Sequence, residues 1–314
     1  MSKPGYSALM HLAIVLLLAS LYFILPEYHS GNLARILVLV VYAIGYNLLF
    51  GYTGLLSLGH ALFFASGMYG LGLAMHLFGI SVIPAFIIGL LFAFLVSTVI
   101  GVLALRTSGV AFMIVTLMFA QAGYLTILLA GKYTRGDEGF VIKQAERSIG
   151  AIDLSMPQNR FYAALTLFTV CFFIAARLVH SRFGKTLVAI RENPERARML
   201  GYDIQRHKLW AVIISGTFAG ASGAAYAVLF GYAGATFATV QYSIYPLLWV
   251  LLGGAGTTVG PLIGTVFMTY LIDISSEYTS AYMLIAGVAL ILLTLFAPHG
   301  LAGIVRKKLL PWLP

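Results

Sequence analysis

The residue patterns that could support enzyme chemistry are incomplete in this sequence. Gly184-Lys185-Thr186 resembles the last three residues of a phosphate-binding loop. The full pattern requires a further glycine five residues before Gly184. Val179 stands at that position, so we expect no ATP binding by this chain. No group of His, Cys and carboxylate residues has metal-ligand spacing, and no Ser has an assignable base and third partner. The sequence therefore predicts no catalytic centre, no metal site and no bound cofactor.

Polar residues inside apolar runs are the second group that could do chemistry. His60 ends a Gly-rich stretch, residues 51–60, which we call the first break, and it lies close to Ser57. The His60 imidazole could hydrogen-bond a transported solute or be satisfied by internal packing, and amides and hydroxyls in such runs often join helices. The candidate pathway residues are Asn47, Ser57, His60, Gln121, Thr257 and Thr258.

The elements that carry these residues must be membrane-spanning helices. Of the 314 residues, 61% are hydrophobic and 9% are charged, whereas soluble domains have roughly 25% charged residues. We predict an all-α polytopic membrane protein, one domain over residues 1–314, with about 8–10 transmembrane helices. The expected apolar segments lie near 9–25, 33–50, 54–78, 80–105, 109–130, 161–180, 209–232, 246–273 and 280–298.

The distribution of Lys and Arg predicts the orientation. These residues stand mainly in short gaps between apolar segments, which explains the net charge of +9 without a nucleic-acid partner. The strongest basic block, residues 181–208, should be cytoplasmic by the positive-inside rule. Counting crossings places Lys3 and Arg106 inside, and the loops 131–160 and 233–245 outside. The loop 131–160 carries basic residues too, which weighs against its placement.

A second Gly-rich stretch, residues 253–261, which we call the second break, interrupts the segment 246–273. The basic cluster Arg306, Lys307 and Lys308 should also be cytoplasmic, yet three full crossings after residue 208 would place it outside. A broken or re-entrant path through this segment would change the number of crossings and place the basic cluster in the cytoplasm. Irregular backbone at membrane depth needs protein or a water-filled cavity around it, so the two breaks could mark a substrate site. A simple kink is the alternative.

The basic block contains the signals of a short helix. Asn193 is a good N-cap, and Pro194 suits the first helical position. The negative charge of Glu195 is favourable near the positive end of the helix dipole. Gly201 supplies the stop. We expect a helix over about 194–200 that presents Arg196 and Arg198 either to a partner protein or to solvent.

Residues 184–201 resemble the cytoplasmic EAA loop of ABC importer permeases, in the form found in LivM-like branched-chain amino-acid permeases. Glu195, Ala197 and Gly201 match the pattern, and Arg196 replaces its first Ala. The resemblance continues through residues 54–64, 136–139, 253–261 and 298–301. It implies that the residues coupling the chain to an ATPase are Arg191, Glu195, Arg196, Ala197, Arg198 and Gly201.

The resemblance further implies a function and a set of partners. The chain would be the permease subunit of an importer for leucine, isoleucine, valine or a related small polar solute, in the bacterial inner membrane. A second permease, two ATPases that use ATP and an extracytoplasmic binding protein would complete the complex.

The alternatives are an ion-coupled carrier and a passive channel. A carrier normally needs ionisable groups at membrane depth, but Asp273 and Glu277 fall near a segment end, and Arg35 is close enough to an interface to snorkel.

Overall fold

The computed structural model describes residues 4–296 and 300–303 of the chain. Lys3, the basic cluster Arg306, Lys307 and Lys308, and residues 298 and 299 of the last resembling stretch lie outside the described residues.

The described chain is an all-α bundle, as the sequence predicts. Six helices are long and apolar enough to cross a membrane, and they comprise residues 27–52, His60–Phe78, Val82–Ala104, Val110–Leu129, Pro157–His180 and Ile204–Phe230. The first of them is α2 (Glu27–Asn47), continued by the π-helical turn η1 (Leu48–Tyr52), and the others are α3, α4, α5, α7 and α10. The helices α1 (Pro4–Ile24), α11 (Val240–Gly253), α12 (Gly260–Tyr278) and α13 (Tyr282–Phe296) complete the bundle.

The most buried helices are α2 and α10, which form its centre. Their apolar windows are 89% and 83% buried, whereas those of α4 and α5 are 28% and 17% buried. A helix that is apolar on all sides is stable only in a protein core or in lipid. The packing of α3, α4 and α7 around α2 and α10 therefore leaves α5 and one side of α4 to face lipid or another subunit.

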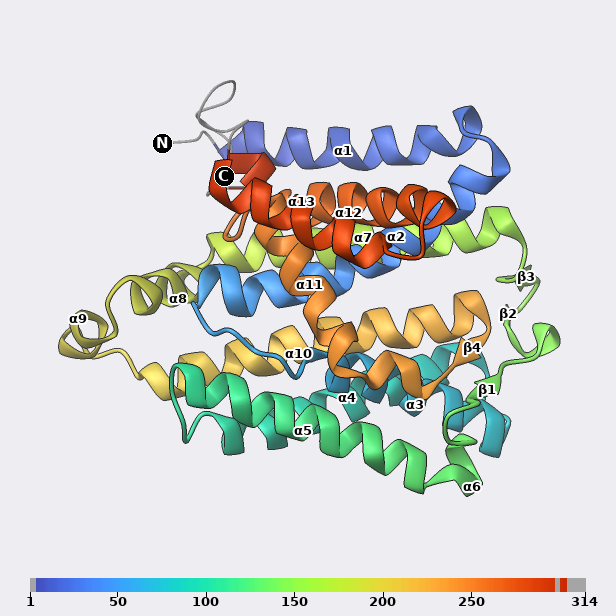
Figure 1. Cartoon of the computed structure of the whole chain (residues 1–314), viewed down its shortest axis with the longest axis horizontal. Helices are drawn as coiled ribbons and strands as arrows, with labels where there is room; N and C mark the ends of the chain where they lie inside the picture. Colours follow the sequence, from blue (N-terminus) through green and yellow to red (C-terminus); the bar gives the residue numbers. More distant parts are fainter. Residues whose placement is uncertain (1–3, 297–299, 304–314) are drawn as a thin grey trace.

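Two short helices, α8 (Arg182–Glu192) and α9 (Pro194–Met199), lie at one end of the bundle, which we call the α8–α9 end (Figure 1). The opposite end, which we call the β end, carries α6 (Gly131–Thr134), η2 (Gln144–Glu146) and four short strands. Those strands are β1 (Phe140–Val141), β2 (Ser148–Ile149), β3 (Ile152–Asp153) and β4 (Tyr232–Ala233). The start of α1 and the end of α13 both lie at the α8–α9 end, as does the turn between α4 and α5.

The second break interrupts the apolar segment near 246–273, as the sequence predicts, and divides it into two antiparallel helices. α11 leads toward the α8–α9 end, α12 returns toward the β end, and α13 crosses back (Figure 1). The additional crossing brings the end of α13 to the same end of the bundle as α8 and α9. The number of crossings is thus changed by a turn between two helices at the second break rather than by a kink.

The loop predicted over 233–245 is also shorter than expected. After β4 the chain folds inward as η3 (Ala235–Ala238), and α11 begins at Val240. Ala235 and Ala238 are fully buried, and the Phe237 ring lies 6.0 Å from that of Phe64 on α3. The re-entrant backbone therefore lies before α11, one element earlier than the sequence suggested.

Candidate functional site

The helix predicted near 194–200 is present as α9, and its start is capped as expected. The Asn193 side chain accepts a hydrogen bond from the Arg196 backbone N–H at 3.0 Å, and Pro194 occupies the first turn. An Asn cap satisfies one of the backbone donors that a helix start leaves free.

Gly201 ends α9 in the left-handed conformation, with φ of +85°. The Gly201 N–H donates to the Arg198 carbonyl at 2.9 Å, and the Tyr202 N–H donates to the Ala197 carbonyl at 3.2 Å. These two bonds form a Schellman motif. A Cβ at Gly201 would meet no atom within 4 Å, so the glycine is required by its backbone angle and not by lack of space.

The sequence prediction missed α8, which precedes α9. The Ser181 hydroxyl caps its start by accepting from the Gly184 N–H at 3.3 Å. Gly184, Leu187 and Ile190 are buried at helical spacing, a pattern that could have indicated this helix. Ala197 of α9 is buried with Ile190 and with Ile204 at the start of α10. The two short helices therefore form one compact unit on the end of α10.

The outward surface of α9 combines charge with apolar groups. Glu195 and Arg198 form an exposed ion pair at 3.3 Å, and Arg196 is exposed beside them. Met199 and Leu200 are 79% and 75% exposed. Large apolar side chains exposed beside such charges favour protein contact over simple solvation. Sequence reasoning identified the arginines but missed this apolar pair.

Arg191 at the end of α8 connects this unit to the first break. Its Nη1 donates a hydrogen bond to the Gly51 carbonyl, and its Nη2 pairs with Glu192 at 2.8 Å. Its side chain also lies against Gly54 and Gly256, where added Cβ atoms would stand 2.8 Å and 3.2 Å from it. Arg191 thus contacts both breaks.

The two breaks lie against each other, and Asn47 joins them. The Asn47 Nδ2 donates to the Thr257 carbonyl at 2.8 Å, and its Oδ1 accepts from the Gly256 N–H at 2.9 Å. A Cβ at Gly51 would come within 2.4 Å of the Gly256 backbone nitrogen, so the close approach requires glycine there. The sequence predicted both breaks but not their contact.

His60 is the last residue of the first break and the first residue of α3, and it is fully buried. Its Nε2 lies 2.7 Å from the Ser215 hydroxyl of α10, which itself donates to the Gly45 carbonyl at 2.6 Å. Because the hydroxyl proton is directed at Gly45, the hydrogen-bond pattern assigns the donated proton to His60 Nε2. His60 Nδ1 then has a free acceptor position, and it has no partner among the described residues.

In this conformation the surroundings of His60 agree with a role in internal packing rather than in contact with a solute. The Tyr46 and Phe63 rings lie 4.7 Å and 5.3 Å from the imidazole at steep angles. Ser57 is fully buried as well, and its carbonyl accepts from the Tyr46 hydroxyl at 2.9 Å. A solute could reach His60 only if these elements move.

The remaining candidate pathway residues have different surroundings. The Thr257 hydroxyl donates to the Gly254 carbonyl at 2.7 Å and accepts from the Gly260 N–H at 3.1 Å, so it satisfies backbone freed by the second break. The Thr258 hydroxyl is buried without a partner among the described residues. Gln121 lies apart from this group, on the exposed side of α5.

The β end closes over the opposite side of the bundle. β1 pairs antiparallel with β4, so the two loops expected outside are joined in one small sheet. Asp153 in the same region accepts hydrogen bonds from the Ser155 hydroxyl at 2.5 Å and from the Ser155 N–H at 2.8 Å. These bonds stabilise the carboxylate and lower the pKa of Asp153.

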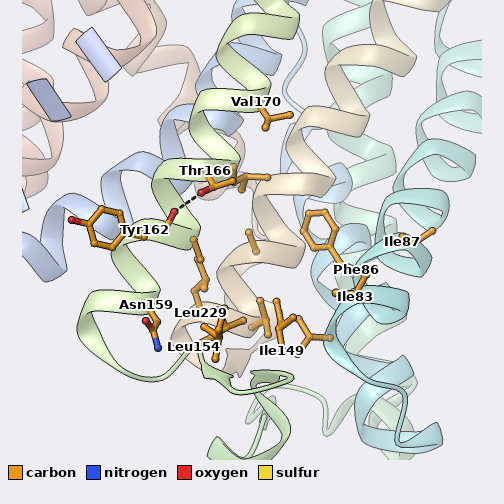
Figure 2. A pocket seen from close by; sticks show the side chains of 16 residues that line it. Ile83, Phe86, Ile87, Ile149, Leu154, Asn159, Tyr162, Thr166, Val170 and Leu229 are labelled. Atoms are coloured by element: carbon orange, nitrogen blue, oxygen red, sulfur yellow. Dashed lines mark hydrogen bonds between the residues drawn. The ribbon is translucent and has the colours of Figure 1, made fainter. Parts of the chain in front are cut away.

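A large apolar cleft lies between α4, α7 and α10 and has a volume of about 590 Å³ (Figure 2). Ile83, Phe86 and Val170 point into it. Its described lining includes no charged side chain, so it offers no opposite charge to an ammonium or a carboxylate group. Within the described part of the chain, no three His, Cys, Asp or Glu residues are grouped so that they could hold a metal ion.

The fold defines a polytopic membrane protein with interrupted helices and a compact helical unit at one end. The chain belongs to the family described as branched-chain amino acid transport system permease components, whose family model matches residues 29–295. The family resemblance stated from the sequence is thus confirmed, and the family is one of transport permeases, not of enzymes.

Named relatives agree with this assignment. The chain is 26% identical to the high-affinity branched-chain amino acid transport system permease protein LivM of Escherichia coli (strain K12), over 87% of this chain and 69% of that protein. It is 30% identical to a probable branched-chain amino acid transport permease protein LivH of Methanocaldococcus jannaschii, over 42% of this chain and 44% of that protein. No solved structure matches the chain.

Proposed function

We propose that this chain forms a single transmembrane domain, the permease subunit of an ABC importer that carries leucine, isoleucine or valine into the cytoplasm. The observation that carries the proposal is the family match over residues 29–295. The expected partners are a second permease in a heterodimer, two ATPase subunits that use ATP, and an extracytoplasmic binding protein. The α8–α9 end would lie on the cytoplasmic side of a bacterial inner membrane.

In this proposal α9 is the docking element. Arg196 and Arg198 meet acidic groups of the ATPase, while Met199 and Leu200 fill an apolar recess in it. The burial of Ala197 against α8 and α10 supports this role, because a rigid unit transmits movement that a flexible loop would absorb. Glu195 holds the helix start, and Gly201 fixes its end.

Movement of α8 would reach the substrate pathway through Arg191. Its contacts with both breaks, together with the bonds of Asn47, support the proposal that nucleotide-driven docking displaces the two breaks together. The pathway would then open past Ser57, His60, Thr257 and Thr258. Gln121 on the exposed side of α5 would face the partner permease.

Uptake by the complex reconstituted in proteoliposomes tests the proposal. Labelled leucine, isoleucine, valine and urea would be supplied with the binding protein, with ATP enclosed and with or without ionophores. The proposal predicts ATP-dependent accumulation of the amino acids that persists with ionophores. Loss of uptake on collapse of an ion gradient would indicate a carrier, and equilibration without accumulation would indicate a channel.

A further inference from the structure

An ion pair between α2 and α12 lies outside the site described above. Arg35 of α2 and Asp273 of α12 pair at 2.9 Å, and both side chains are partly buried. Arg35 therefore does not simply snorkel to an interface, as the sequence suggested. Charged groups among apolar helices are costly, and they are retained where they serve a pathway or a binding site.

The pair forms one wall of a cavity of about 170 Å³ between α2, α10, α11 and α12. A cavity that holds one water needs about 10–15 Å³, and pockets for drug-sized ligands start near 300 Å³. The space therefore suits one small solute.

The rest of the wall is mainly aromatic and aliphatic, with contributions from Leu39, Phe237, Trp249 and Ile272. Because Arg35 and Leu39 are one helical turn apart on α2, Leu39 lies about 6 Å deeper from the β end than Arg35. Arg35 Nε and Trp249 Nε1 are buried without hydrogen-bond partners among the described residues.

The cavity also adjoins the His60 region. Tyr242 belongs to its wall, stacks on Tyr42 with ring centres 6.1 Å apart, and accepts a hydrogen bond at its carbonyl from the Tyr42 hydroxyl at 3.1 Å. The Tyr42 ring lies 6.4 Å from the His60 ring. These two tyrosines separate the cavity from the buried end of the first break.

We propose that this cavity binds the substrate as a zwitterionic α-amino acid with an aliphatic side chain, before passage toward His60. Arg35 takes the α-carboxylate, Asp273 takes the α-ammonium, and the side chain lies between Leu39, Phe237 and Trp249. A ligand with both charges can replace the Arg35–Asp273 pair, whereas a singly charged analogue can pair with only one of the two partly buried charges and urea with neither. This proposal rests on the proposed function, and it assigns the selection of the substrate to the Arg35–Asp273 pair.

Equilibrium binding of radiolabelled leucine to the purified permease and ATPase complex, without binding protein, is the first test. We expect saturable binding that isoleucine and valine displace. Leucinamide, which lacks the carboxylate, and 4-methylpentanoate, which lacks the ammonium group, should compete about tenfold or more weakly. Absence of saturable binding, or equal competition by either analogue, overturns the proposal.

Variants of the complete reconstituted transporter give the second test. Asp273→Asn should raise the KM for leucine about tenfold or more. Glu277→Gln, which neutralises an exposed carboxylate one turn further along α12, should leave the KM unchanged. The double variant Arg35→Met with Asp273→Leu removes both charges together, so no unpaired charge disturbs folding, and it should also raise the KM.

The outcomes separate this proposal from the proposed function. If the wild-type transporter accumulates leucine with ATP and the double variant has an unchanged KM, the cavity proposal fails alone. If the wild-type transporter does not accumulate leucine, both proposals fail.

Discussion

The Asn47 side chain of α2 and the Thr257 backbone are joined by a buried hydrogen bond of 2.8 Å, although 210 residues separate them in sequence. The bond holds the second break against the end of α2, where the first break begins. Since the same amide accepts from the Gly256 N–H, one side chain fixes two backbone groups that have left regular helix geometry.

Asn47→Leu should therefore destabilise the chain and slow transport. The Thr257 carbonyl and the Gly256 N–H would lose their partner, at about 1–3 kcal/mol for each buried group left unsatisfied. Thermal unfolding of the purified protein and uptake by the reconstituted complex measure the two effects. Asn159→Leu removes one amide hydrogen bond near the β end and is the control. Equal losses in both variants would contradict a special role for Asn47.

His60→Ala should lower the rate of uptake and the thermal stability together. The variant removes a hydrogen bond to Ser215 and the ring contacts with Tyr46, at about 1–3 kcal/mol. Ser66→Ala is a matched control on α3, because that hydroxyl donates only within its own helix, to Phe63. Wild-type rate and selectivity in His60→Ala, at equal amounts in the membrane, would assign His60 to packing alone.

Gly201→Val should uncouple ATP hydrolysis from uptake, because a β-branched residue at φ of +85° is strained by about 1–3 kcal/mol. Gly201→Asn is the control, since Asn adopts the left-handed conformation more readily and there is open space for its side chain. ATPase activity and uptake would be measured on the same complexes. A coupled Val variant, or an Asn variant as defective as Val, would argue against the helix end as the cause.

Cysteine labelling tests the orientation. Gln144 lies at the β end and Lys185 of α8 at the α8–α9 end, and both are exposed, whereas the native Cys171 is buried. A membrane-impermeant maleimide should label Gln144→Cys in cells whose outer membrane has been removed, and Lys185→Cys only after the inner membrane is opened. Labelling of both positions from the same side would contradict the topology.

Local signals in the sequence predicted much of this fold. The apolar segments gave the membrane helices, and Asn193, Pro194 and Gly201 gave the bounds of α9 almost to the residue, because caps depend on adjacent residues. The two breaks were visible as glycine clusters. The inward turn at η3 was missed because its small apolar residues resemble any other apolar run.

The candidate site was less predictable because its contacts join distant segments. No local pattern indicates that Arg191 reaches Gly51, that Asn47 reaches Thr257, or that Ser215 meets His60. Similarly, the partner of Arg35 stands on α12, so the sequence alone suggested an isolated side chain near an interface.

We expect α8 to transmit nucleotide-driven movement to the two breaks through Arg191. The number of leucine molecules imported per ATP hydrolysed measures this transmission. Arg191→Met removes the charged hydrogen bond to Gly51, worth about 1.5–3 kcal/mol, while Arg182→Met removes an exposed positive charge from the same helix. We expect Arg191→Met to hydrolyse ATP but to import about tenfold less leucine per ATP, and Arg182→Met to match the wild type. An unchanged ratio in a folded and assembled Arg191→Met complex would show that Arg191 does not couple α8 to the breaks.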